Sequence, residues 1–182
     1  MKTAIILAEG FEDIEAITTI DVLRRAGISI DVVSAASELV KGARGIIVKS
    51  EKNIDEIDSS EYACVVCPGG LPGSDNLMND ERVIGFVQQV YDKGGIAAAI
   101  CAAPQVLNRA GLLKGKKVTC YPGREKSFDE SVIYTKEQFT IDGRIITADG
   151  PGSAMIFALE LVALLAGREK SETVRLGLRY NL

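Results

Sequence analysis

Residues 96–104 read IAAAICAAP, and this stretch decides the fold. Its first five residues are apolar, which is typical of a strand buried on both faces of a parallel sheet. Pro104 is tolerated in the first turn of a helix, because the N–H that it lacks has no partner there. The stretch therefore predicts a buried strand that ends at Cys101 and turns at once into a helix.

Apolar strands and helical patterns alternate along the rest of the chain. Strands are expected at 4–8, 28–34, 46–48 and 62–67, and helices at 14–26 and 81–91. Short strands at 132–135, 139–141 and 144–147 surround the hairpin turn Asp142-Gly143, and Ser153 is the expected N-cap of a final helical region. This alternation indicates an α/β protein with a mostly parallel central sheet, helices on both faces and a short hairpin. No linker divides the chain, so one domain is expected over 1–182.

The helix expected at 14–26 carries its apolar side chains in one near-vertical stripe, which is typical of an amphipathic helix. The stripe consists of Ile14, Ile17, Ile20 and Leu23.

The composition limits the chemistry. The 182 residues have a net charge of −4 and contain no histidine, so Ser-His and Cys-His pairs and imidazole metal sites are excluded. The charge balance makes nucleic acid a poor expected partner. The apolar run at 4–8 is too short for a signal peptide, and the run at 154–166 falls short of a membrane span. Four cysteines are sparse for a disulfide scaffold, so a reducing, cytoplasmic setting is expected.

Cys101 is the leading candidate nucleophile. The positive partial charge of a helix N-terminus favours the thiolate, and a sharp strand-to-helix turn lifts the sulfur out of the sheet, as in a nucleophile elbow. The alternative is that Cys101 is a small buried hydrophobic residue. Its place at the junction favours the functional interpretation.

Two further strand ends carry candidate residues. Gly69 and Gly70 let backbone N–H groups approach a ligand, which suits an oxyanion pocket, although Pro-Gly-Gly is more often a simple turn. Glu15 lies roughly one turn inside the helix that follows the first strand and reaches back toward the strand ends, where a carboxyl group close to the thiolate would be protonated and could relay protons. Glu12 and Asp13 fit the alternative of solvated acids in the first turn of a helix.

The pair Cys64 and Cys67 has the spacing of a metal or redox motif. Residues three apart in a strand point to opposite faces, so we reject that interpretation. Whether Cys67 or Cys120 approaches Cys101 stays open.

Taken together, these segments resemble the ThiJ/PfpI superfamily, in the branch of the human parkinsonism-associated protein deglycase and its bacterial relatives. The resemblance covers nearly the whole chain. It rests on GFEDIEA at 10–16, DVLRRAG at 21–27, CPGG at 67–70, AAICAAP at 98–104 and GPGS at 150–153.

The resemblance implies a flavodoxin-like sandwich that forms a homodimer and uses no cofactor. It implies that Cys101 is the nucleophile, Glu15 its protonated partner, and the backbone N–H groups of Gly69, Gly70 and Ala102 an oxyanion pocket. Tyr121 stands where several members carry a histidine, and a phenol with a pKa near ~10 is a poor base at neutral pH. Arg44 is a further candidate for the lining of the site.

The activity implied is a glutathione-independent glyoxalase or protein deglycase, which converts α-oxoaldehydes or their glycation adducts to 2-hydroxy acids. Ala102 stands where the peptidase branch has histidine, so peptidase activity is not expected. One alternative is an oxidative-stress sensor or redox-regulated chaperone that uses the same cysteine. A second alternative is a non-catalytic binding domain that has kept the fold.

Overall fold

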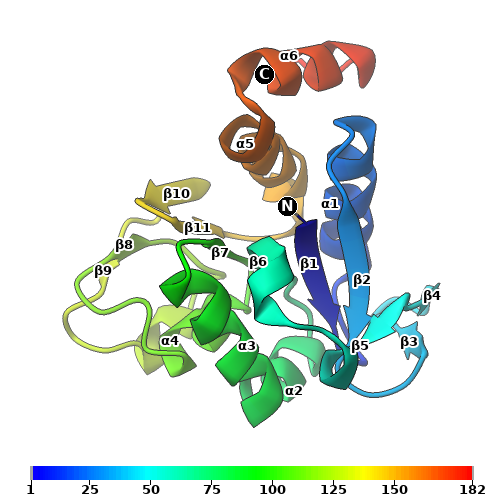
Figure 1. Cartoon of the computed structure of the whole chain (residues 1–182). Helices are drawn as coiled ribbons and strands as arrows, with labels where there is room; N and C mark the ends of the chain where they lie inside the picture. Colours follow the sequence, from blue (N-terminus) through cyan, green and yellow to red (C-terminus); the bar gives the residue numbers. More distant parts are fainter. Residues whose placement is uncertain (1, 182) are drawn as a thin grey trace.

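A seven-stranded sheet forms the centre of the computed structural model, which describes residues 2–181 (Figure 1). The strand order is β10-β11-β7-β6-β1-β2-β5. Within this sheet only β10 and β11 pair in antiparallel fashion, and the order β2-β1-β6-β7-β11 is that of flavodoxin-like folds. The strands are β1 (Lys2–Leu7), β2 (Ile30–Ser34), β5 (Lys52–Asn53), β6 (Tyr62–Cys67), β7 (Ile96–Ile100), β10 (Phe139–Asp142) and β11 (Ile145–Ala148).

Helices cover both faces of this sheet (Figure 1). On one face lie α1 (Asp13–Arg25) and α5 (Ala154–Ala166), with α6 (Arg168–Gly177) packed outside α5. On the other lie α2 (Gly73–Met78), α3 (Glu81–Asp92) and α4 (Pro104–Arg109). The central strands β1, β6 and β7 are apolar on both faces, so each helical layer packs against its own hydrophobic cluster. The predicted three-layer sandwich is confirmed.

Shorter elements lie around the sheet. The antiparallel hairpin β3 (Leu39–Lys41) and β4 (Ile47–Lys49) projects from one edge, and β8 (Lys117–Val118) pairs with β9 (Ile133–Tyr134). Four 3₁₀ turns complete this set within residues 2–181: η1 (Ile54–Glu56), η2 (Ser59–Glu61), η3 (Arg124–Ser127) and η4 (Pro151–Ser153). The hairpin predicted at Asp142-Gly143 is confirmed, but β9 does not join the central sheet.

The stripe expected on α1 is only half buried. Ile20 is 8% exposed and Leu23 is fully buried, whereas Ile14 is 55% and Ile17 40% exposed. The helix begins with Glu15 turned towards the strand ends, and this orientation rotates the first turn of the stripe into solvent. Only the second half of the apolar stripe therefore faces the core.

Two details near the C-terminus also differ from expectation. The final helical region consists of α5 and α6, separated at Gly167, whose φ of 93° is left-handed. Ser153 occupies the N-cap of α5, but its hydroxyl bonds the Asp149 carboxylate and does not cap the helix.

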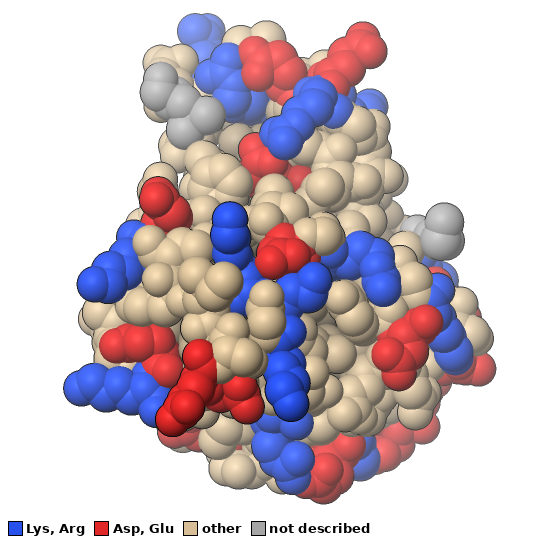
Figure 2. Space-filling model, turned by 90° about the vertical axis from the view of Figure 1, so that its left-hand side faces the viewer, with Lys and Arg blue, Asp and Glu red and all other residues tan. Residues whose placement is uncertain are grey.

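No helix within residues 2–181 combines the length and the apolar character that crossing a membrane requires. Figure 2 shows Lys and Arg interspersed with Asp and Glu over one face of the molecule.

Candidate active site

Cys101 lies in a sharp turn between β7 and α4. Its φ is 63°, a left-handed conformation that is strained for a residue with a side chain. Its N–H donates to the Ala148 carbonyl at 2.9 Å, and its carbonyl accepts from the Tyr121 N–H at 2.7 Å. These bonds tie the turn to two neighbouring segments, so the surrounding fold imposes the conformation. The side chain is 9% exposed.

Glu15, in the first turn of α1, is fully buried and lies beside Cys101. The Gly69 N–H donates to its Oε2 at 2.7 Å. Its other oxygen, Oε1, is buried and has no hydrogen-bond partner among the residues that the structure describes. A proton on Oε1 would have no competing acceptor among these residues, and the Glu15 carboxyl is close enough to Cys101 for their side chains to interact.

The pair of groups is electrostatically coupled. Burial raises the pKa of Glu15 from 4.5 to about 7, against the opposing effect of the Gly69 N–H. Burial and the Glu15 carboxylate raise the pKa of the Cys101 thiol to about 12. Two negative charges are thus unfavourable here, and the pair retains one proton over a wide range of pH.

The source of thiolate stabilisation differs from the expectation. Helix α4 is only six residues long and begins at Pro104, three positions beyond Cys101. Backbone N–H groups of Gly70 and Ala102 lie close enough to the sulfur to lower the pKa of Cys101, but burial and Glu15 outweigh them. A lowered thiol pKa produced by a helix dipole is therefore the wrong description.

Gly69 and Gly70 fit tightly against the site. A Cβ on Gly69 would come within 2.6 Å of Cys101 Cβ and 2.8 Å of Glu15 Oε2. Gly70 has a φ of 89°, which favours glycine. The Gly69 N–H already donates to Glu15, so the prediction that Gly69 is an oxyanion donor is wrong. Gly69 positions the carboxyl group of Glu15, whereas the N–H groups of Gly70 and Ala102 face the sulfur.

A cavity of about 820 Å³ opens over Cys101. Arg44 and Tyr121, both predicted as candidates, line it together with the glycine loop. Glu12, Arg124 and Pro151 also line it, although they were not predicted as site residues. The Gly-Pro-Gly-Ser motif was a signal for Pro151, whereas nothing in the sequence singled out Arg124. The lining is Glu12, Ala43, Arg44, Gly70, Leu71, Cys101, Ala102, Tyr121, Pro122, Gly123, Arg124 and Pro151.

Asp13 positions one wall of this cavity. Its carboxylate accepts from the N–H of Arg44 at 2.8 Å and from the N–H of Ile46 at 3.0 Å. Asp13 is 3% and Glu12 8% exposed. The expectation that both acids are solvated is therefore wrong, because Asp13 binds the loop between β3 and β4.

The other cysteines have different surroundings. Cys64 and Cys67 belong to different hydrophobic clusters, so their divergence is confirmed. Cys67 also lies in a different cluster from Cys101. Burial raises the pKa of Cys67 and Cys120 to about 12 and that of Cys64 still further. Within residues 2–181 no group of ligating side chains has the arrangement of a metal site.

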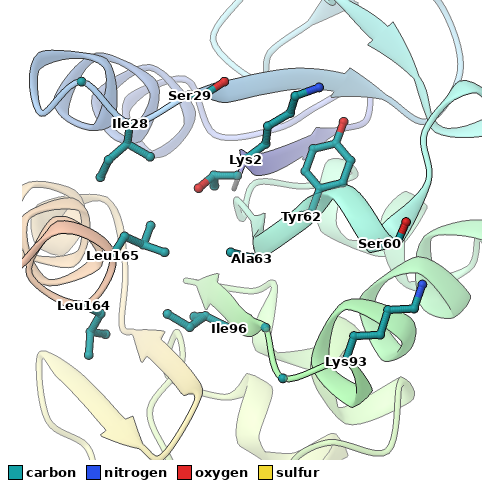
Figure 3. A pocket seen from close by; sticks show the side chains of 14 residues that line it. Lys2, Ile28, Ser29, Ser60, Tyr62, Ala63, Lys93, Ile96, Leu164 and Leu165 are labelled. Carbon is teal, nitrogen blue, oxygen red and sulfur yellow. The ribbon is translucent and has the colours of Figure 1, made fainter.

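A second cavity, of about 600 Å³, lies at the opposite ends of the strands (Figure 3). Lys2 and Lys93 line it together with the hydroxyl-bearing Ser29, Ser60 and Tyr62, and apolar side chains such as Ile28, Ile96 and Leu165 complete the view. Lys2 Nζ is 2.9 Å from Glu61 Oε2, and Lys93 Nζ donates to Ser59 Oγ at 2.9 Å. The lining contains no cysteine and no carboxylate, so the chemistry belongs to the cavity over Cys101.

The fold and the site define a flavodoxin-like α/β protein whose distinctive feature is a cysteine elbow in contact with a buried glutamate. Residues 1–164 match the model of the DJ-1/PfpI family, and the chain belongs to this family. It is similar to protein dj-1beta of Drosophila melanogaster, at 39% identity over 96% of this chain and 94% of the relative. It is also similar to the Parkinson disease protein 7 homolog of Danio rerio, at 33% identity over 96% of this chain and 94% of the relative.

Solved structures agree with these relatives. Oxidized DJ-1 of Toxoplasma gondii superimposes with a TM-score of 0.94 at 33% identity, over 100% of this chain and 99% of the other. Drosophila melanogaster DJ-1beta superimposes with a TM-score of 0.93 at 37% identity, over the same shares of the two chains. The resemblance stated from the sequence motifs is confirmed.

Proposed function

We propose that this protein is a glutathione-independent enzyme of the glyoxalase or deglycase type, which converts small α-oxoaldehydes or their adducts to 2-hydroxy acids. The observation that carries the proposal is the buried Glu15 carboxyl, with a pKa of about 7, beside the Cys101 sulfur. This pair supplies a nucleophile and a group able to give and take a proton near neutral pH.

The first step is addition. The Cys101 thiolate attacks the aldehyde carbon, a C–S bond forms, and the carbonyl electron pair becomes an oxyanion. The N–H groups of Gly70 and Ala102 lie close to the sulfur, which supports them as donors to that oxygen. One such donor is worth about 2.7–4 kcal/mol of barrier in acyl transfer. Protonation of the oxyanion by Glu15 gives a neutral hemithioacetal and leaves a carboxylate.

The second step is an internal oxidation–reduction. The Glu15 carboxylate removes the hydrogen on the former aldehyde carbon as a proton, which leaves an enediolate and a protonated Glu15. Return of a proton to the neighbouring carbon gives a 2-hydroxyacyl thioester on Cys101. Water hydrolyses this thioester to the 2-hydroxy acid and restores the thiol. The aldehyde carbon is oxidised while the neighbouring carbonyl carbon is reduced, so the reaction needs no redox cofactor and no glutathione.

The direct test is D-lactate formation from methylglyoxal without glutathione. We expect turnover by the wild type and its loss in Cys101→Ser, because a serine hydroxyl is far less readily ionised than a thiol. Cys64→Ser is the matched control, since Cys64 is fully buried and does not line the cavity. Equal turnover by the wild type and Cys101→Ser would overturn the proposed mechanism.

The alternative function is oxidant sensing at the same sulfur. It is supported by the similarity to a DJ-1 that was solved in its oxidized form. A sensor is expected to oxidise at Cys101 at peroxide doses that spare the fully buried Cys64 and Cys120. Mass spectrometry after mild peroxide treatment tests this. Unchanged thiol reactivity of Cys101 relative to a denatured control would favour a non-catalytic binding domain.

A homodimer is proposed from apolar side chains on one side of the molecule. Ile14 and Ile17 on α1 are exposed, as are Leu39 and Ile47 on the β3–β4 hairpin. Asp13 joins the start of α1 to the loop of this hairpin, so the two sets are neighbours. Light scattering should show a dimer that Ile17→Glu dissociates, and a wild-type monomer would contradict the proposal.

A reducing compartment such as the cytoplasm fits the four unpaired cysteines.

A further inference from the structure

Two arginines line the cavity over Cys101, although a neutral oxoaldehyde offers a guanidinium nothing to bind strongly. Arg44 comes from the loop between β3 and β4, and Arg124 is the first residue of η3. The single carboxylate in the lining is that of Glu12. The lining therefore carries more positive than negative charge.

Arg124 is held in place by two side chains of the neighbouring helices. One of its terminal nitrogens, Nη1, is 3.5 Å from Asp75 Oδ1 and 3.4 Å from Gln105 Oε1. Gln105 is 4% exposed, and its Nε2 donates to the same Asp75 oxygen at 2.7 Å. The contacts of Arg124 are long, and the shorter bond to Asp75 belongs to Gln105.

Arg124 thus retains donors for a ligand. A guanidinium has five N–H donors, and the contacts above engage only one of its nitrogens. The side chain is 29% exposed, so the guanidinium is contacted through Nη1 alone and is still accessible from the cavity. A guanidinium of this kind matches the geometry of a carboxylate or phosphate with two parallel hydrogen bonds.

Arg44 is positioned differently. Its backbone N–H is fixed by Asp13 at 2.8 Å, while its side chain is exposed. Within residues 2–181 its guanidinium makes no ion pair at 4.0 Å or less. A second cation is therefore present in the lining of the same cavity.

We infer that the site selects carbonyl substrates that carry an anionic oxygen group, a carboxylate or a phosphate, a few bonds from the reacting aldehyde, and that Arg124 is the specificity-determining residue. This inference rests on the proposed function. The size of the cavity, about 820 Å³, also exceeds what a three-carbon oxoaldehyde fills and lies in the range of larger ligands.

The chemistry for such a substrate is unchanged. With 4,5-dioxopentanoate, Cys101 adds to the aldehyde carbon, the proton moves to the neighbouring carbon, and addition of one water gives 2-hydroxypentanedioate. The distal carboxylate takes no part in bond making and is available to Arg124.

The test compares 4,5-dioxopentanoate with its methyl ester, which has the same reacting carbons without the charge. We expect the wild type to favour the acid by about tenfold in kcat/KM, mainly through KM, because one charge-assisted bidentate contact is gained. In Arg124→Met this ratio should fall to near one, and Arg124→Lys should give an intermediate ratio. Lys126→Met, an exposed position in the same turn, is the matched control and should keep the wild-type ratio.

The outcomes separate the inference from the proposed function. Equal kcat/KM for acid and ester in the wild type, or an unchanged ratio in Arg124→Met, overturns the inference and leaves the glyoxalase activity standing. A purely structural Arg124 would lower both substrates alike and keep the ratio, which also overturns it. A 2-oxoaldehyde bearing a phosphate identifies which anion is preferred.

A second measurement tests whether Arg124 binds an anionic group, and it does not depend on turnover. If no oxoaldehyde reacts, the proposed function fails, and alkylation of Cys101 by iodoacetamide still reports occupancy. We expect glutarate to protect Cys101 in the wild type and in Lys126→Met, and to protect it at least several-fold less in Arg124→Met. Equal protection by glutarate and by its dimethyl ester would overturn the anionic specificity.

Discussion

Replacing Glu15 by glutamine should change the pH dependence of stability. Burial raises the pKa of Glu15 from 4.5 to about 7, so the folded state holds a proton that the unfolded chain releases. This contribution to stability is fully present below pH 4.5 and is lost as the pH rises through 7. At 1.36 kcal/mol per pH unit, the loss is on the order of 3 kcal/mol. Glutamine does not ionise, so the Glu15→Gln variant does not lose this stability at high pH.

The expected result is a crossover between the wild type and Glu15→Gln. The amide nitrogen would have only a sulfur as acceptor, which costs about 1 kcal/mol at every pH. At pH 4 the variant should therefore be slightly less stable than the wild type. At pH 8 it should be more stable by about 2 kcal/mol, or roughly 4–8 °C in Tm for a chain of this size.

Urea and thermal unfolding at pH 4 and pH 8 measure this crossover, and the difference between the two pH values does not depend on the cost of the amide. Glu9→Gln is the control, because Glu9 is exposed and surface substitutions change stability by about 0.5 kcal/mol or less. The reasoning is refuted if the difference between Glu15→Gln and the wild type is the same at both pH values.

Two further substitutions test the packing of the site. Gly69→Ala places a Cβ 2.6 Å from that of Cys101 and 2.8 Å from Glu15 Oε2. We therefore expect turnover to fall and the free energy of unfolding to drop by about 1–3 kcal/mol. Unaltered kinetics and an unaltered urea midpoint would contradict the tight packing of Gly69 against these two side chains. Asp13→Ala removes the acceptor of the Arg44 and Ile46 N–H groups, so urea unfolding should show a loss of about 1–3 kcal/mol and proteolysis should cleave the β3–β4 loop faster. Wild-type stability and cleavage would show that Asp13 does not hold the loop.

Much of the fold followed from local patterns in the sequence. The apolar strand before Cys101, with a proline three residues later, predicted the strand-to-helix turn, and the structure shows it with a φ of 63°. The Asp142-Gly143 hairpin was predicted from turn chemistry alone. Both signals lie within a few neighbouring residues, so no long-range information was needed.

Other features depend on contacts between distant segments. The first turn of α1 faces outward at Ile14 because Glu15 meets Gly69, a residue fifty-four positions away. Helix α2 begins at Gly73 after a Pro-Gly-Gly run, and its six residues are too few for a helical period to show. The spacing of apolar residues in the sequence predicts neither of these two features.

Some residues of the site were predicted from the sequence and others were not. Cys101 and Glu15 were found because each follows a strand of a parallel sheet, and the carboxyl ends of such strands meet at one edge. Arg124 was missed because η3 reaches the cavity through the long segment after β8, whose path the sequence does not determine. The direction of the Cys101 pKa was predicted incorrectly because burial and the neighbouring carboxylate outweigh the backbone N–H groups.

The central claim is that Cys101 and Glu15 hold one proton between them, so that the negative charge of the pair can reside on the sulfur. The most direct test is the rate of Cys101 alkylation as a function of pH, in the wild type and in Glu15→Gln. We predict that the wild-type rate rises with an inflection near pH 7, where the pair first loses a proton, and that Glu15→Gln lacks this inflection. A wild-type profile without an inflection near pH 7, or the same profile in the wild type and in Glu15→Gln, would contradict the coupling of the two groups.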